Sequence, residues 1–128
     1  MSKKILAIDD EVDTLTFYSE VLEDYGFTPI TAENGLEGVK TSREKKPDLI
    51  LLDIMMPKQG GLKTYKELKN DPELKHVPVI IITGISKEVD YKVLLTKQST
   101  GGISPEGHLV KPVTAENLIT EIRRILGQ

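Results

Sequence analysis

The sequence predicts an α/β fold, in which a doubly wound five-stranded parallel sheet lies between two layers of helices. Short apolar segments alternate with segments of helical periodicity, a pattern typical of parallel strands joined by right-handed crossovers. Residues 49–52 read Leu-Ile-Leu-Leu without polar alternation, as expected for a strand covered on both faces. The length of 128 residues, without a linker-like stretch, favours a single domain over residues 1–128.

The first two strands are expected at different places in the sheet. Residues 5–8 are wholly apolar and form the first, central strand. Residues 27–32 form the second, where Pro29 has no amide hydrogen and therefore places the strand at an edge. Between them, a helix from Val12 to about Tyr25 is predicted from apolar residues at three-and-four spacing. Its inward residues are Val12, Leu15, Tyr18, Val21 and Leu22.

The middle of the chain places one helix on either side of the third strand. Asn34 is expected to cap a helix that extends to about Lys45. The third strand covers residues 49–53 and is apolar up to its final acid. The glycine pair 60–61 precedes the next helix, which ends near Asn70 because a proline follows shortly after it.

The last third of the chain contains two further strands. Residues 77–83 are mostly β-branched and form the fourth strand. Ser86 is expected to cap a fourth helix, and residues 98–107 form an irregular connection to a short fifth strand, residues 108–110. Thr114 caps the final helix. The inward residues of that helix are predicted to be Leu118, Ile122, Ile125 and Leu126.

These positions predict the order of the strands. An edge second strand with central first and third strands suits the order 2-1-3-4-5, the flavodoxin-like three-layer sandwich. In such sheets ligands bind beyond the carboxyl ends of the strands, at the switch point between the first and third strands.

Polar residues stand at the carboxyl ends of four strands. Asp9 and Asp10 follow the first, Asp53 ends the third, Thr83 ends the fourth and Lys111 follows the fifth. Three neighbouring carboxylates repel one another unless a cation neutralises them, and oxygen ligands of this kind suit Mg²⁺. Asp53 is the candidate nucleophile for a phosphoryl group, whose oxygens Lys111 and Thr83 would hold.

Five segments resemble those of the response-regulator receiver domain of two-component signalling, a CheY-like domain. The match extends over nearly the whole chain, and five segments in this order are far more specific than any one alone. They are residues 5–11 (ILAIDDE), 32–37 (AENGLE), 47–57 (PDLILLDIMMP), 79–83 (VIIIT) and 111–112 (KP). The resemblance implies a phosphoryl-accepting signalling switch with no output domain in this sequence.

The resemblance also implies roles for the acids. Asp53 accepts a phosphoryl group from a sensor histidine kinase or a phosphotransfer protein. Asp10 and Asp53 ligate Mg²⁺ directly, Asp9 acts mainly through water, and the backbone carbonyl of Met55 completes the protein ligands. The domain would catalyse its own Mg²⁺-dependent phosphorylation and slow dephosphorylation, and would switch the binding of an unidentified downstream protein.

On the phosphate side, the resemblance implies that Thr83 and Lys111 follow the phosphoryl group and that the peptide bond before Pro112 is cis. His108 stands where the family commonly has Tyr or Phe. Region 84–107 is several residues longer than usual and is expected to be remodelled. His108 is therefore either a packed, partly exposed ring or a pH-sensitive switch residue coupled to Thr83.

Three other functions are weighed against the phosphorylated switch. The alternative is a phosphorylation-independent protein-interaction module with a remodelled region 84–107. A haloacid-dehalogenase-like phosphatase needs a second acid where Met55 stands. A flavin site is opposed by the acids at residues 9–11, which would repel a phosphate.

The composition limits which cellular compartment and which classes of partner are expected. A net charge of −3 without any Trp argues against direct nucleic-acid binding. Without Cys there is no disulfide, thiolate zinc site or Cys nucleophile. No signal peptide or membrane-spanning segment is recognised, so we expect a cytoplasmic protein with no membrane partner, as a monomer or weak homodimer.

The sequence also predicts the lifetime of the phosphorylated form. Met55 and Ile85 stand two residues after Asp53 and Thr83, respectively, and neither apolar side chain can orient an attacking water. We expect slow self-dephosphorylation, measured as the decay of the phosphorylated protein after removal of the phosphodonor. A half-life as short as that of chemotaxis-type receivers would contradict this expectation.

Overall fold

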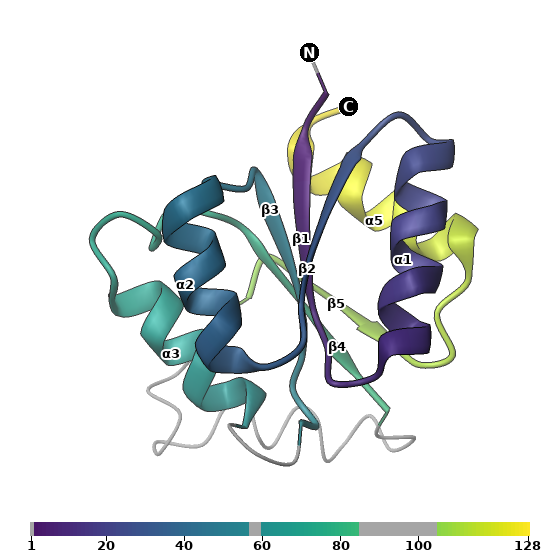
Figure 1. Ribbon diagram of the computed structural model, residues 1–128. Helices are drawn as coiled ribbons and strands as arrows, with labels where there is room; N and C mark the ends of the chain where they lie inside the picture. The colour runs from purple at the N-terminus through teal and green to yellow at the C-terminus, as the bar shows by residue number, and fades with distance from the viewer. Residues whose placement is uncertain (1, 57–59, 85–104) are drawn as a thin grey trace.

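A computed structural model describes residues 2–56, 60–84 and 105–128, and shows the predicted sheet (Figure 1). Its five strands are all parallel, in the order β2-β1-β3-β4-β5, which confirms the predicted fold class and strand order. The strands are β1 (Lys4–Ile8), β2 (Thr28–Ala32), β3 (Leu49–Asp53), β4 (Val79–Thr83) and β5 (Gly107–Val110).

Helices cover both faces of this sheet, so the molecule has three layers. In Figure 1, α1 and α5 lie on one side of the sheet and α2 and α3 on the other. The helices are α1 (Val12–Asp24), α2 (Gly35–Lys45), α3 (Gly61–Asn70) and α5 (Ala115–Leu126). The fourth helix predicted from Ser86, and most of region 84–107, lie outside the described residues.

The central strands are apolar throughout because their side chains alternate between two cores. In β1, Ile5 and Ala7 join the cluster under α1 and α5, whereas Leu6 and Ile8 join the cluster under α2 and α3. All five residues of β3 are buried. The last of them, Asp53, is therefore held on a rigid, fully covered strand.

Local sequence signals set several of the helix ends. The side chain of Asn34 accepts a hydrogen bond from the backbone N–H of Glu37, as predicted, and Thr114 does the same for Asn117. Gly60 is the N-cap of α3 and has no side chain to cap it. Pro29 lies in β2, which is an edge strand as predicted.

One detail of the predicted core is wrong. Val12 was expected on the inner face of α1, but in the first turn of that helix its side chain is 59% exposed. Ile125 and Leu126 of α5 are partly buried and pack against the core cluster under α1 and α5, as predicted. Ile119 belongs to the same cluster and is 3% exposed.

Glu106, just before β5, ties four elements together. Its Oε1 accepts a hydrogen bond of 2.8 Å from the backbone N–H of Val79, and Lys69 Nζ of α3 lies 3.1 Å from its Oε2. Its backbone carbonyl accepts a hydrogen bond of 3.0 Å from Arg124 of α5. The start of β5 is therefore fixed to β4, α3 and α5 at the edge of the sheet opposite the strand ends that carry the acids.

Candidate functional site

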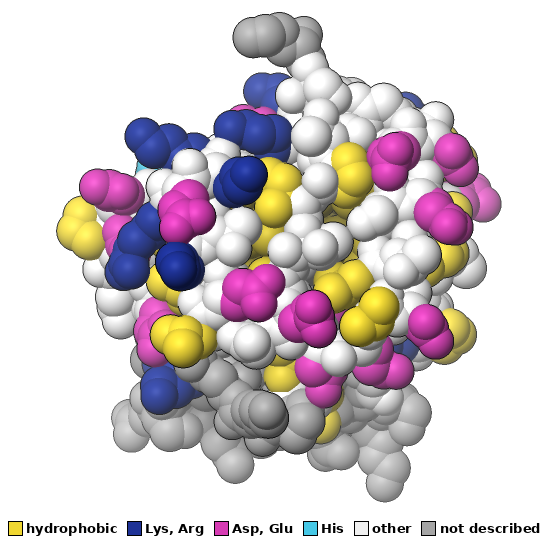
Figure 2. All heavy atoms as spheres, in the orientation of Figure 1, with side chains coloured by type: hydrophobic (Ala, Val, Ile, Leu, Met, Phe, Trp, Pro, Cys, Tyr) yellow, Lys and Arg dark blue, Asp and Glu magenta, His cyan; other side chains and the backbone are white. Residues whose placement is uncertain are grey.

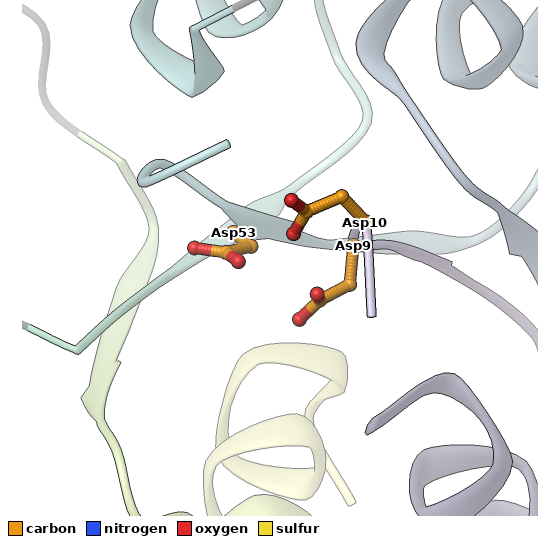
Figure 3. Close-up of side chains that lie close together, drawn as sticks. All are labelled: Asp9, Asp10 and Asp53. Carbon is orange, nitrogen blue, oxygen red and sulfur yellow. The ribbon is translucent and has the colours of Figure 1, made fainter. Parts of the chain in front are cut away.

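The predicted acids meet at the carboxyl edge of the sheet (Figure 3). Asp9 and Asp10 follow β1 and Asp53 ends β3, and these two strands are adjacent. One carboxylate oxygen from each of the three acids lies within 4.8 Å of those of the other two. Asp9 is fully buried and Asp53 is 4% exposed, whereas Asp10 is exposed.

Backbone hydrogen bonds hold two of these carboxylates in place. Asp9 Oδ1 accepts a hydrogen bond of 2.9 Å from the N–H of Glu11, and Asp53 Oδ1 accepts one of 2.9 Å from the N–H of Met55. Each carboxylate thus bonds its own chain two residues ahead, a common turn geometry for Asp. One oxygen of each carboxylate remains directed toward the centre of the site.

Lys111 faces both of those remaining oxygens. Its Nζ lies 3.2 Å from Asp9 Oδ2 and 3.4 Å from Asp53 Oδ2. Its backbone N–H donates a hydrogen bond of 2.8 Å to the carbonyl of Thr83, which positions it beside the end of β4. The peptide bond between Lys111 and Pro112 is cis, as the resemblance implied.

Burial and neighbouring charges shift the pKa values of both Asp9 and Lys111. Burial raises the pKa of Asp9, and the nearby Asp53 adds to the increase, although the Glu11 N–H and Lys111 oppose it. Burial by itself would lower the pKa of Lys111, but the charges of Asp53 and Asp9 outweigh it and the pKa is raised. The ionised acids therefore carry an unfavourable charge density that one lysine does not fully offset.

A close contact between backbones lies beneath Asp53. A Cβ placed on Gly61, the first residue of α3, would lie 2.1 Å from the Cα of Ile54 and 2.6 Å from the carbonyl oxygen of Asp53. The N–H of Gly61 also donates a hydrogen bond of 3.3 Å to the carbonyl of Ile54. Only glycine allows the start of α3 to approach the acceptor strand this closely.

The structure also places the remaining predicted residues. Thr83 is fully buried at the end of β4. His108 is exposed and pairs in register with Ile81, two positions before Thr83. Both readings of His108, as a packed and partly exposed ring or as a switch residue, stay predictions. Met55 is 54% exposed, and Ile85 lies outside the described residues.

Glu11 is a member of the site that the sequence interpretation missed. Its carboxylate lies 3.8 Å from Lys111 Nζ, and the side chain is 67% exposed. Its position directly after Asp10 could have indicated this role. However, an acid at the start of a helix is also expected because it interacts favourably with the helix dipole. Glu11 adds negative charge at the solvent side of the site.

The raised pKa of Asp9 leads to a prediction about stability in the presence of a metal chelator. A raised folded-state pKa means that the contribution of Asp9 to the free energy of unfolding is fully present below its unfolded pKa, near 3.8, and is lost as the pH rises through the folded value. We therefore expect Asp9→Asn to raise the melting temperature at pH 7, with a difference that closes toward pH 4. A variant that melts below the parent protein in chelator at pH 7 would contradict this.

The donor set fits a hard divalent cation. Asp9, Asp10 and Asp53 offer oxygen ligands only, and their carboxylates lie close together at the ends of two adjacent strands (Figure 3). Mg²⁺ is commonly held by one or two carboxylates together with waters and phosphate oxygens. Among the described residues, this is the group of acids that is close enough to hold a metal ion.

A separate feature concerns membranes. In the parts of the chain that the structure describes, no helix has the length and apolar character needed to span a bilayer.

Comparisons with known proteins identify the family. The family model of the response regulator receiver domain matches residues 5–123. The polar-differentiation response regulator DivK of Brucella anthropi is 34% identical over 127 residues, which cover 99% of this chain and 98% of DivK.

Solved structures agree as well. The chemotaxis response regulator CheY4 of Vibrio cholerae superposes with a TM-score of 0.84 at 26% identity, covering 98% of this chain and 99% of that chain. A response regulator receiver domain protein of Clostridium thermocellum superposes with a TM-score of 0.82 at 32% identity, covering 98% and 94%. The chain belongs to the response regulator receiver domain family.

Proposed function

We propose that Asp53 is the phosphoryl acceptor of this receiver domain, with a histidine kinase or a phosphotransfer protein as the donor. One observation carries the proposal: the Asp53 carboxylate is buried beside two further acids, and Lys111 Nζ lies 3.4 Å from its Oδ2. Asp53 also ends a wholly buried strand, so its carboxylate is held rigidly. Receivers of response regulators interact with such kinases or phosphotransfer proteins and with downstream targets.

The chemical step is a displacement at phosphorus. A carboxylate oxygen of Asp53 forms the new bond to phosphorus, the bond from phosphorus to the donor nitrogen or oxygen breaks, and its electron pair leaves with the donor. The backbone N–H of Met55 keeps one Asp53 oxygen in a fixed place through its hydrogen bond. This leaves Oδ2, the oxygen nearer Lys111, as the attacking atom.

Receiver domains generally bind Mg²⁺ at an acidic pocket, and the acids here fit that ion. Asp10 and Asp53 would hold it directly, Asp9 mainly through water, and the backbone carbonyl of Met55 would complete the protein ligands. When bound, Mg²⁺ supplies charge neutralisation for the acids and for the oxygens of the incoming phosphoryl group.

Two other residues would act on the phosphoryl oxygens. Lys111 remains protonated, because the surrounding acids raise its pKa, and its ammonium group can move from Asp53 Oδ2 to a phosphoryl oxygen. The Thr83 hydroxyl would follow the same group. Since the Thr83 carbonyl accepts a hydrogen bond from the Lys111 N–H, movement at either residue is passed to β5, which carries His108.

Other parts of the sequence interpretation also remain proposals. Both hydrophobic clusters pack against the one sheet, which supports treating residues 1–128 as a single domain. The cytoplasmic location, the monomeric or weakly dimeric state and slow self-dephosphorylation stay predictions. Lys111 contacts both Asp9 and Asp53, where its charge can also neutralise an incoming phosphoryl group, and this contact supports the phosphorylated switch over an interaction module that never takes phosphate.

The proposal is tested with a small-molecule phosphodonor. The protein is incubated with acetyl phosphate in the presence of Mg²⁺ and in the presence of a chelator, and its intact mass is measured. We expect one phosphoryl adduct with Mg²⁺, strongly reduced in chelator, and peptide mapping that assigns it to Asp53. Absence of the adduct, or its assignment to Asp9 or Asp10, would refute the proposal.

Mg²⁺ removal also has an expected effect on stability. A ligand that binds only the folded state stabilises it by about 2.7 kcal/mol at a free concentration of about 100 times its Kd. We expect the melting temperature of the parent protein to rise with Mg²⁺ concentration, and that of Asp10→Asn to rise much less. Equal responses of the two proteins would remove Asp10 from the proposed ligands.

A further inference from the structure

A groove runs between α2 and α3, the two helices on the opposite side of the sheet from α1 and α5. Its volume is about 720 Å³. One end is formed by the Arg43 and Asp71 side chains, whose Nε and Oδ2 atoms lie 2.7 Å apart. Near the other end Leu36, in the first turn of α2, is 73% exposed. Leu36 thus gives the groove an apolar surface in contact with solvent.

The walls of this groove are basic, although the chain as a whole is acidic. Lys40 and Arg43 contribute from α2, and Lys63 and Lys66 from α3, against the acids Glu67 and Asp71. The net charge of the protein is −3. Figure 2 shows most of the visible Lys and Arg side chains on the side of the molecule that carries α2 and α3, with some Asp and Glu side chains among them, whereas Asp and Glu predominate on the side of α1.

The ion pair at the end of the groove is itself well fixed. Asp71 Oδ1 accepts a hydrogen bond of 2.8 Å from the N–H of Glu73, while its Oδ2 bonds Arg43. The pKa of Asp71 is lowered by the Glu73 N–H and by Arg43, so it stays ionised and neutralises that arginine. Lys40 and Lys63 have no such partner among the described residues, and they stand on opposite walls.

We propose that the α2–α3 groove docks an acidic, amphipathic segment of a partner protein. Carboxylates of that segment would pair with Lys40 and Lys63, and an apolar side chain would cover Leu36. A nucleic acid is a poorer fit, because the acidic side of the molecule would repel a long phosphate backbone. Two helices of 10 and 11 residues also limit the contact to a short segment, about three helical turns long.

This surface is separate from phosphoryl transfer. None of the residues that line the groove belongs to the acidic site around Asp53. A partner docked between α2 and α3 would therefore leave the face around Lys111 accessible to a phosphodonor. We expect Asp53→Asn to bind such a segment as well as the parent protein does.

The test uses a defined probe. It is a synthetic helical peptide of about 14 residues, roughly 20 Å long, with Leu on one face and Glu on the remaining positions, together with the same peptide carrying Lys in place of Glu. Binding is followed through the backbone amide signals of the isotopically labelled protein. We expect the Glu peptide to shift signals from residues 36–43 and 63–70, with weaker binding at higher salt, and the Lys peptide to leave them unchanged.

Charge reversal supplies the matched control. Lys40→Glu with Lys63→Glu is expected to weaken binding of the Glu peptide by about tenfold, because each exposed ion pair is replaced by a repulsion. Lys3→Glu with Lys75→Glu changes the net charge equally at exposed positions outside the groove and is expected to keep the parent affinity. Thermal unfolding of each variant checks the fold, and Lys40→Gln with Lys63→Gln replaces the first variant if that one does not fold.

Four results would overturn the proposal. The first is equal affinity for the two peptides, and the second is a set of shifted signals that lies on α1 instead. The third is a charge-reversed groove variant that keeps the parent affinity. The fourth is self-association of the parent protein in sedimentation velocity that the groove variant lacks; the occupant is then a second copy of this chain, whose acidic side faces the groove.

Discussion

Asp53→Asn is expected to abolish phosphoryl uptake from acetyl phosphate and Mg²⁺. An amide is not a nucleophile toward phosphorus under these conditions, so no adduct forms at this position. The fold should persist, because the Asn side-chain oxygen can still accept the hydrogen bond that the Met55 N–H donates to Asp53. Removing one of two neighbouring buried charges also relieves the repulsion that Asp9 experiences.

The readout for this variant is intact mass together with the melting temperature. Asp13→Asn is the matched control, since Asp13 is an exposed acid in the first turn of α1 and is not part of the acidic group. The control should take up phosphate at the parental rate. Uptake by Asp53→Asn at a comparable rate would show that another residue is the acceptor.

Gly61→Ala is expected to destabilise the protein and to impair the site at the same time. The new Cβ would meet backbone atoms of Ile54 and Asp53, which cannot turn aside as a flexible side chain can. Overpacking of this kind costs about 3 kcal/mol, which in a domain of this size lowers the melting temperature by about 10 °C. The displacement is transmitted directly to the acceptor strand, so phosphoryl uptake should also be slower.

The neighbouring glycine is the control for this experiment. A Cβ on Gly60 would meet no atom within 4 Å, and its φ of −55° suits any residue. Gly60→Ala loses only the small advantage of Gly over Ala at an N-cap, less than about 1 kcal/mol. If thermal unfolding and phosphoryl uptake respond equally in the two variants, the close approach of Gly61 is not what matters.

The apolar pattern was sufficient to predict the sheet. Strands with both faces covered are apolar almost throughout. The apolar runs in β1, β3 and β4 therefore identified these strands as central ones. Pro29 then identified the edge strand, from which the order followed. Because parallel strands end at one edge, the same pattern predicted that Asp9, Asp53 and Lys111 would meet.

Features that depend on how separate elements pack against one another could not be predicted from the apolar pattern. Helical periodicity does not specify how well the first turn of α1 is covered, and Val12 in that turn is 59% exposed. The close contact of Gly61 with Ile54 joins the start of a helix to the end of a strand, and the pattern of neither element indicates it. Likewise the groove arises from the spacing of α2 and α3, and neither helix alone indicates that Lys40 and Lys63 face the same space.

The bonds made by Glu106 have a consequence for how this domain can diversify. They fasten the chain just after residues 85–104, while the buried Thr83 fastens it just before. Changes in length or composition between these two anchors therefore need not displace Lys111, whose backbone is bonded to Thr83. Sequence changes between the two anchors, whether natural or engineered, can therefore leave the acidic site and Lys111 in register.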